Sequence, residues 1–259
     1  MHGLGNDFVI VDARREAFDV TPALAKAIAD RRIGVGCDQL IILDRSDRAD
    51  LRMRIWNSDG SEVQSCGNAT RCVIQLTGVE RIETAGGLLE GRKEGSEIEV
   101  SLGEPRFRWD EIPLAYPMDT AALPMAWDGL EHPMALSVGN PHLVFFVPDA
   151  REVPLDELGP RVENDPAFPE RINVNVATSV DNRLKLRTFE RGSGETLACG
   201  TGACATAVAA IASKRTQSPV RVDMTGGSLT VRWSPGEPVR MRGSAVHVFE
   251  GELDLESVQ

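Results

Sequence analysis

The chain has 259 residues, 42% of them hydrophobic and 26% charged, which is ordinary for a soluble globular protein with a buried core. Its formal net charge of −11, with no cluster of lysine and arginine, does not favour a nucleic-acid-binding protein. No apolar run approaches the roughly 18 residues of a membrane span, and the N-terminus lacks a signal-peptide pattern. We therefore expect a cytoplasmic protein whose five cysteines are reduced thiols.

Short β-branched or alternating segments predict strands along most of the chain. In chain order they are residues 8–13, 38–45, 50–57, 97–102, 142–147, 183–189, 220–225, 228–233 and 247–253. Three segments predict helices. Residues 21–32 form the clearest surface helix, with Thr21 as its N-cap. Residues 67–78 and 200–215 each start at the glycine of a Cys-Gly pair, and the second is so rich in Ala, Val and Ile that it should be buried.

The chain contains an internal repeat. GNDFVIVDA resembles GNPHLVFFVPDA, and CGNATRCVIQL resembles CGTGACATAVA. Four polar landmarks recur at a spacing of about 133 or 134 positions: Asn6 with Asn140, Gln39 with Asn173, Asn57 with Glu190, and Cys66 with Cys199. The alternative is coincidence among short glycine-containing strings, which a constant spacing over four pairs makes the weaker interpretation. The repeat predicts two similar halves with a site between them.

The predicted fold class is α+β. We expect two pseudo-symmetric halves, each a mostly antiparallel sheet wrapped around a central helix, with the active site in the cleft between them. The segment from Pro113 to Pro133 is proline-rich and irregular, so we place the boundary near it. The expected halves are residues 1–110, joined by a returning C-terminal strand at 248–259, and residues 111–247.

Cys66 and Cys199 both lie at the predicted start of a helix. Backbone N–H groups and the helix macrodipole at such a position favour the thiolate, so we expect lowered pKa values for both thiols. The same N–H groups form a site for a carboxylate. Two thiols on opposite faces of one carbon could remove an α-proton and return another with inversion, while the helix ends stabilise the developing negative charge.

Other roles for the cysteines are also open. A buried free cysteine is commonly a small apolar residue, and this is the preferred interpretation of Cys37, Cys72 and Cys204. Zinc sites usually require paired C-x-x-C or histidine spacing, which is missing, so no metal is expected. A redox-active disulfide between Cys66 and Cys199 is less plausible than an acid/base pair.

The motifs MHGLGNDFVIVD, GCDQLIIL, NSDGS…CGN…RC, GNPH, NVNV and ERGSGETLACGTGACA together resemble the diaminopimelate epimerase family over essentially the whole chain. The resemblance implies an isomerase of lysine and cell-wall precursor biosynthesis that interconverts LL- and meso-diaminopimelate without a cofactor, as a cytoplasmic homodimer. It implies that Cys66 and Cys199 are the catalytic acid/bases, with His142 and Glu190 as supporting groups. Its substrate-binding positions match Asn6, Gln39, Asn57, Gly67, Asn68, Asn140, Asn173, Glu190, Arg191, Gly200 and Thr201.

The first cysteine motif departs from the family pattern, which commonly reads MCGNGAR, because this chain reads SCGNATR over residues 65–71 and has Ala69 where the second glycine stands. Arg71 and Asp7 are better explained by structural hydrogen bonding. Three alternatives remain: a racemase or epimerase of cyclic amino acids such as proline, a silent amino-acid-binding module, and a thiol redox protein. Arg191 and the many amides argue against a proline-type substrate, which has no distal amino-acid end.

Overall fold

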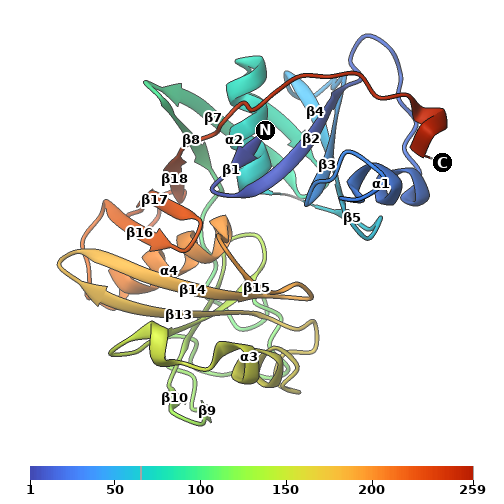
Figure 1. The fold of residues 1–259 in the computed structure, drawn as a ribbon. Helices are drawn as coiled ribbons and strands as arrows, with labels where there is room; N and C mark the ends of the chain where they lie inside the picture. Colours follow the sequence, from blue (N-terminus) through green and yellow to red (C-terminus); the bar gives the residue numbers. More distant parts are fainter. Residues whose placement is uncertain (65, 259) are drawn as a thin grey trace. The chain divides into compact units, whose positions relative to one another are not determined.

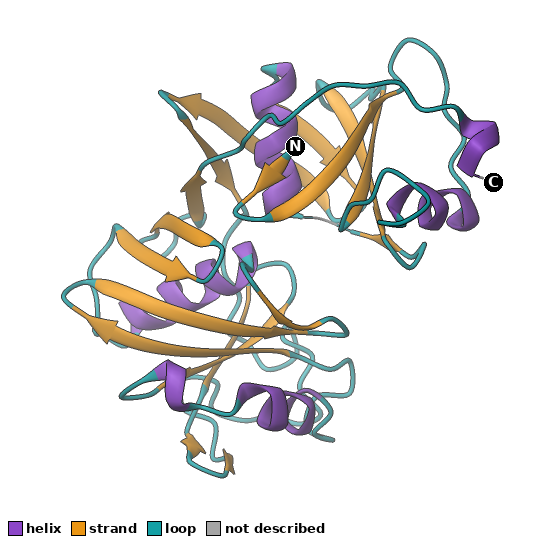
Figure 2. Cartoon of the chain, in the orientation of Figure 1, coloured by secondary structure: helices purple, strands orange, loops and turns teal. Residues whose placement is uncertain are grey.

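A computed structural model describes residues 1–64 and 66–258 (Figures 1 and 2). The described chain is a mixed α/β structure with many strands and four α-helices. It divides into two compact units, Met1–Val100 with Gly243–Gln259, and Ser101–Arg242. Among the described residues, no helix is long and apolar enough to cross a membrane.

The first unit contains one mixed sheet and two helices. Its strands follow the order β1-β2-β3-β4-β6-β7-β8, with β5 paired to β4. Their bounds are β1 His2–Gly3, β2 Asn6–Asp12, β3 Gln39–Asp44, β4 Leu51–Asn57, β5 Glu62–Val63, β6 Arg81–Thr84, β7 Gly87–Glu94 and β8 Glu97–Ser101. Helix α1, Pro22–Ala29, packs its Ala25 and Ile28 on one face of the sheet. Helix α2, Gly67–Thr77, contacts β1, β2 and β7 and lies within the strands of its unit in Figure 1.

The second unit repeats this arrangement. Its strands follow the order β11-β12-β13-β14-β16-β17-β18, with β15 paired to β14, and a separate hairpin joins β9 to β10. Their bounds are β9 Ala126–Trp127, β10 Leu130–Glu131, β11 Met134–Ser137, β12 Pro141–Phe146, β13 Asn173–Val180, β14 Arg183–Glu190, β15 Gly194–Thr196, β16 Val220–Met224, β17 Gly227–Arg232 and β18 Arg240–Gly243. Helix α3, Leu155–Glu163, packs on one face of the sheet, and α4, Gly200–Ala212, contacts six strands from the other side.

Pairing in the two units follows one pattern. In the first unit β2 and β3 are parallel, β3 and β4 antiparallel, β4 and β6 parallel, and β6 and β7 antiparallel. The second unit has the same alternation along β12, β13, β14, β16 and β17. Register is also matched, because Ile41 lies opposite Ile55 and their counterparts in the repeat, Asn175 and Thr188, also lie opposite each other. Antiparallel pairs outnumber parallel ones in each unit, and the central helices α2 and α4 occupy equivalent places in the chain.

The three predicted helices are present. Thr21 caps α1 by accepting a hydrogen bond from the Leu24 N–H at 3.1 Å, as its position predicts. All of α4 is buried except Thr201, Ile211 and Ala212, which confirms the prediction of a helix buried nearly all round. Small residues let the strands approach this helix closely.

Some elements differ from the sequence-based prediction. The predicted strand at 247–253 is wrong: these residues have no strand assignment in the described chain, Val246 before them forms an isolated bridge with His2, and Phe249 is 66% exposed. The C-terminal segment instead ends in a 3-10 turn, Leu255–Val258, which contacts α1. Helix α3 was not predicted, because Pro160 and its acidic residues hide its apolar face. Of the described strands with four or more residues, β6, β7, β11, β13 and β18 were also not predicted.

The division between units falls about ten residues before the boundary expected at 110/111. Residues after Val100 belong with the second unit because Leu102 N–H bonds the Val239 carbonyl and Arg106 exchanges backbone hydrogen bonds with Ser137. The proline-rich segment from Pro113 to Pro133 is irregular apart from the β9–β10 hairpin. Its Leu123 and Leu130 enter the core beneath α3.

Candidate functional site

The candidate residues form two sets, one in each unit, and each set surrounds the start of a central helix. Cys66 is the N-cap of α2, and its thiol makes no capping hydrogen bond to its own helix. The side chain of Asn6, at the start of β2, lies beside it. Asn6 Oδ1 is 3.9 Å from Cys66 Sγ and accepts a hydrogen bond from Asn68 Nδ2 at 3.3 Å. The first set therefore joins the thiol to the opening turn of its helix through one amide.

A charged cluster holds Asn6 in place. Asn6 Nδ2 donates to Asp38 Oδ2 at 2.9 Å, and Arg31 bridges Asp38 and Asp7, the latter through two hydrogen bonds of 2.8 and 2.9 Å. The Arg31 guanidinium lowers the pKa of Asp7 to about 2. Asp7 thus has the structural role that its sequence context suggested.

Arg71 also has a structural role. Its side chain is fully buried and donates to Asn68 Oδ1 at 2.8 Å and to the Ser244 carbonyl at 3.3 Å. These bonds orient the Asn68 amide so that its Nδ2 faces Asn6. The arginine therefore fixes a candidate binding residue and ties α2 to the returning C-terminal segment.

Gln39 and Asn57 form a second polar pair in the first unit. They lie opposite each other on β3 and β4, and Gln39 Nε2 donates to Asn57 Oδ1 at 2.9 Å. Asn57 in turn donates to Ser61 Oγ at 3.1 Å. Gln39 Oε1 is buried and has no hydrogen-bond partner among the described residues. A buried amide oxygen left in this state is suited to accept a hydrogen bond from a bound ammonium group.

In the second unit, Cys199 is the N-cap of α4. Its Sγ accepts a hydrogen bond from the Gly202 N–H at 3.4 Å and lies 3.6 Å from Thr201 Oγ1. The expected lowering of the pKa is wrong for this thiol. Burial raises the pKa of Cys199 well above its usual range, the Glu190 carboxylate raises it further, and the contacts with Thr201 and Gly202 only partly oppose them. Desolvation of the thiolate outweighs the helix end, so Cys199 is held as a protonated thiol.

His142 and Asn140 connect to the same helix start. Asn140 Nδ2 donates to Thr201 Oγ1 at 3.3 Å, which is the counterpart of the Asn68–Asn6 contact. His142 Nε2 lies 2.9 Å from Asn140 Oδ1. Burial, with a smaller contribution from the Arg191 charge, lowers the pKa of His142 to about 3, so the imidazole is neutral near neutral pH. His142 is thus joined to Thr201, and through it to Cys199, by the Asn140 amide.

The remaining expected residues lie at the β13–β14 end of the unit. Asn173 is buried and holds two backbone groups, donating to the Pro141 carbonyl at 2.8 Å and accepting from the Arg191 N–H at 3.0 Å. Glu190 accepts from Thr196 Oγ1 at 2.5 Å, and Arg191 donates to the Glu170 carbonyl at 3.0 Å. The Asn173 amide therefore positions the chain that carries Glu190 and Arg191.

Two polar residues beside this set were missed by the sequence analysis. Asn175 and Thr188 are buried opposite each other on β13 and β14, and Asn175 Nδ2 lies 3.1 Å from His142 Nδ1. Alternating strand patterns do not distinguish them from ordinary inward-facing residues. The internal repeat offered a signal, because the matching positions, Ile41 and Ile55, are apolar.

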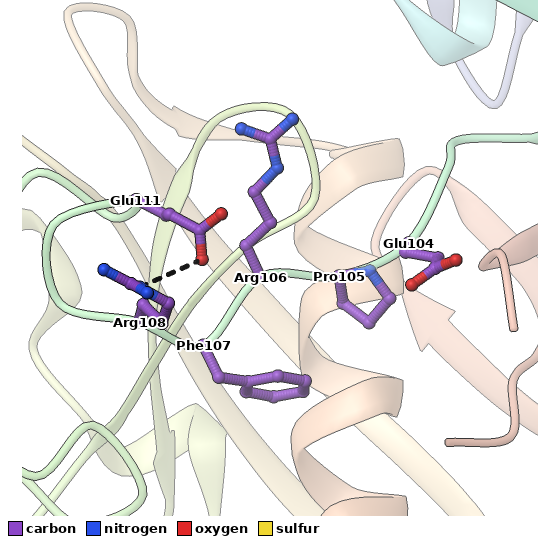
Figure 3. Close-up of a pocket in the computed structure, with 6 residues that line it drawn as sticks. All are labelled: Glu104, Pro105, Arg106, Phe107, Arg108 and Glu111. Atoms are coloured by element: carbon purple, nitrogen blue, oxygen red, sulfur yellow. Dashed lines mark ion pairs between the residues drawn. The ribbon is translucent and has the colours of Figure 1, made fainter. Parts of the chain in front are cut away.

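The other cysteines are apolar core residues. Cys37, Cys72 and Cys204 are buried, and burial raises the pKa of Cys37 to about 11 and that of Cys72 to about 12. No group of three or more His, Cys, Asp or Glu side chains that could hold a metal occurs in residues 1–64 and 66–258. The hollow drawn in Figure 3 is lined by residues 104–108 and Glu111, none of them in either set.

Two comparisons of the sequence with known proteins agree on one family. The family model described as "Diaminopimelate epimerase" matches residues 1–108 and 134–248. The chain is 62% identical to a diaminopimelate epimerase of Rhizorhabdus wittichii, covering 99% of this chain and 95% of the relative. It is 60% identical to that of Sphingopyxis alaskensis, covering 98% and 96%.

Solved structures share the fold at low sequence identity. A phenazine biosynthesis protein of the PhzF family from Bacillus anthracis matches with a TM-score of 0.68 at 19% identity, over 98% of this chain and 95% of that one. A hydroxyproline epimerase from Agrobacterium vitis matches with a TM-score of 0.60 at 16% identity, over 94% and 86%. The family model spans most of the chain and the curated relatives span nearly all of it, so the chain belongs to the diaminopimelate epimerase family.

Proposed function

We propose that this protein interconverts LL- and meso-diaminopimelate, with Cys66 and Cys199 as the two acid/bases. The observation that carries the proposal is that each thiol is the N-cap of the central helix of its unit, at matching places in a repeated fold. Two relatives that are 62% and 60% identical over nearly the full chain are diaminopimelate epimerases, and this similarity supports diaminopimelate as the substrate.

The reaction requires one thiolate and one thiol. The thiolate takes the α-proton from one face of the substrate carbon, and the C–H electron pair passes into an enolate-like carbanion. The opposite thiol then delivers its proton to the other face, which inverts the centre and leaves the two sulfur atoms with exchanged protonation states. Burial and Glu190 hold Cys199 as a thiol in the substrate-free protein, which suits it to enter a turnover as the acid.

The first turns of α2 and α4 supply the anion stabilisation. Backbone N–H groups at the start of a helix have no acceptor within that helix and favour negative charge. Gly67, Asn68, Gly200 and Thr201 contribute these turns, and a substrate carboxylate bound there would be stabilised further as charge develops on the adjacent carbon. We propose that both helix starts act on one substrate, in a cleft that closes to exclude water.

A second amino-acid end distinguishes diaminopimelate from proline-type substrates. We assign its ammonium to the unpartnered Gln39 Oε1 beside Asn57, and its carboxylate to the Arg191 guanidinium. Asn6, Asn140 and Glu190 would complete the binding surface, with Asn173 holding the chain that carries Arg191. We propose in addition that the protein works as a cytoplasmic homodimer.

The test is proton NMR of LL-diaminopimelate with the reduced protein in D2O. Loss of the α-hydrogen signal together with appearance of the meso isomer supports the proposal. L-Proline and trans-4-hydroxy-L-proline are run in parallel as controls. Exchange of the α-hydrogen of the cyclic amino acids, without exchange of that of diaminopimelate, would refute the proposed substrate. Binding of diaminopimelate without any α-hydrogen exchange would indicate an amino-acid-binding module.

A further inference from the structure

A line of buried polar side chains runs through the sheet of the second unit towards Cys199. It consists of Thr188, Asn175, His142 and Asn140, followed by Thr201 on α4. The first three are essentially inaccessible to solvent. Burying polar side chains costs free energy unless their hydrogen bonds are satisfied. Such a line therefore requires a reason beyond packing.

The first unit shows that the fold itself does not need these polar groups. The positions that match His142, Asn175 and Thr188 in the repeat are Phe8, Ile41 and Ile55, at the same spacing of about 133 or 134 residues. Ile41 and Ile55 lie opposite each other, as Asn175 and Thr188 do. All three apolar residues are buried. The same places in one architecture are thus filled by hydrocarbon in one unit and by a hydrogen-bonded set in the other.

Donor and acceptor roles along the line are determined by the Leu143 backbone carbonyl, which lies against Asn175. Asn175 Nδ2 lies 3.0 Å from the Leu143 carbonyl, which can only accept, so this side of the amide is the NH2 group. Asn175 Oδ1 consequently accepts from the Thr188 hydroxyl at 3.0 Å. The second Nδ2 hydrogen is directed at His142 Nδ1 at 3.1 Å, so that nitrogen is the acceptor.

A neutral imidazole that accepts at Nδ1 carries its proton on Nε2. His142 Nε2–H then donates to Asn140 Oδ1 at 2.9 Å, which leaves Asn140 Nδ2 facing Thr201 Oγ1. The opposite tautomer would place two donors against each other at Asn175 and two acceptors at Asn140. Asn175 therefore determines the orientation of the Asn140 amide through His142, which lies between them.

Asn175 and Thr188 also pack directly on the start of α4. A Cβ atom at Gly202 would lie 2.6 Å from Asn175 Oδ1 and 2.9 Å from Thr188 Oγ1. Gly202 N–H is the donor to Cys199 Sγ. At the matching place in the first unit the helix carries Ala69, which is fully buried. Only the glycine lets the first turn of α4 rest against the polar pair.

We propose that Asn175 and Thr188 are positioning residues that fix His142 as the neutral Nε2–H tautomer and thereby orient Asn140 and Thr201 at the Cys199 end of α4. The pair touches no reacting atom. Its effect on turnover rests on the function proposed above, but the tautomer is a property of the substrate-free protein.

The test is long-range ¹H–¹⁵N NMR of reduced protein labelled with ¹⁵N-histidine. The chain has four histidines, and loss of one signal in His142→Phe identifies the relevant ring. In the unsubstituted protein at neutral pH we expect a protonated Nε2 and an unprotonated Nδ1. A protonated Nδ1 would overturn the proposal without any further variant.

Thr188→Val and Thr188→Ser form the matched pair. Valine keeps the volume but removes the hydroxyl, so Asn175 Oδ1 loses its donor while Asn175 Nδ2 still donates to the Leu143 carbonyl. We therefore expect the His142 tautomer to be kept and kcat to fall about 10-fold with little change in KM, because the amide is held less firmly. Serine keeps the hydroxyl and should restore kcat. An unaltered kcat in folded Thr188→Val would refute the positioning role of Thr188.

Asn175→Asp tests the tautomer itself, because it removes the donor that faces His142 Nδ1. A carboxylate can only accept, so His142 should then carry a proton on Nδ1, and an unprotonated Nδ1 in this variant would also refute the proposal. Failure of the proposed function gives a different result. A protein inactive on diaminopimelate, whose tautomer nevertheless responds to this substitution, would refute the function and support the positioning role.

Discussion

Substitution of Gly202 by alanine tests how tightly α4 is fitted to its sheet. The added Cβ would lie 2.6 Å from Asn175 Oδ1, 2.9 Å from Thr188 Oγ1 and 3.2 Å from Cys199 Cβ. The first two distances require movement of buried groups. Overpacking of this kind costs about 1–3 kcal/mol, and disturbing the Asn175–Thr188 hydrogen bond adds about 1 kcal/mol. The higher helix propensity of alanine offsets about 1 kcal/mol of this loss in the free energy of unfolding.

The free energy of unfolding of Gly202→Ala should therefore be lower by about 1–3 kcal/mol. Urea unfolding followed by tryptophan fluorescence measures it, since the chain has four tryptophans. Because the Gly202 N–H bonds the thiol, kcat should fall as well. The matched control is Ala69→Gly at the equivalent position of α2, which should lose about 1 kcal/mol of helix propensity and about 1 kcal/mol from the buried methyl group that it removes. A Gly202→Ala protein as stable as the unsubstituted chain would refute the described packing.

Three further predictions concern charge and catalysis. His142 binds its proton more weakly in the folded state, so lowering the pH from 6.5 to 5.0 should reduce the free energy of unfolding by about 1.5 kcal/mol, and His142→Phe should flatten this dependence in urea titrations at the two pH values. Arg31 lowers the pKa of the partly exposed Asp7, so the pair stabilises the fold above pH 4 and less so as the pH falls towards 2. Asp7→Asn should cost about 1 kcal/mol at pH 7, and an unchanged urea midpoint would contradict this. Cys66→Ser and Cys199→Ser should each lower kcat at least about 100-fold while circular dichroism stays unchanged; near-normal turnover of either would refute the two-thiol reaction.

The internal repeat made much of the architecture predictable. The spacing that relates Cys66 to Cys199 placed both thiols at the start of a central helix, and the structure has both as N-caps. The alanine-rich composition of α4 predicted its burial correctly because no face of this helix is polar. Periodicity and capping were sufficient wherever local sequence determines the element.

Tertiary effects account for most of what was missed. The expected low pKa of Cys199 follows from its helix position alone, but burial and the Glu190 carboxylate, known only from the fold, reverse the direction. Asn175 and Thr188 are more than ten residues apart and meet only through the β13–β14 register. Phe249 and its neighbours have a strand-like sequence but remain exposed, because the bridge between His2 and Val246 does not continue beyond Val246 in the described residues.

The most direct test of the two-thiol reaction is the position of deuterium in the first turnovers of LL-diaminopimelate in D2O. A thiol holds a single proton, so the hydrogen removed by one cysteine is not the one delivered by the other. If two thiols act on opposite faces, newly formed meso isomer carries deuterium at the inverted carbon while recovered LL isomer still carries hydrogen. Deuterium entering the recovered LL isomer as fast as the meso isomer would show that one base serves both faces, and would contradict the two-thiol reaction.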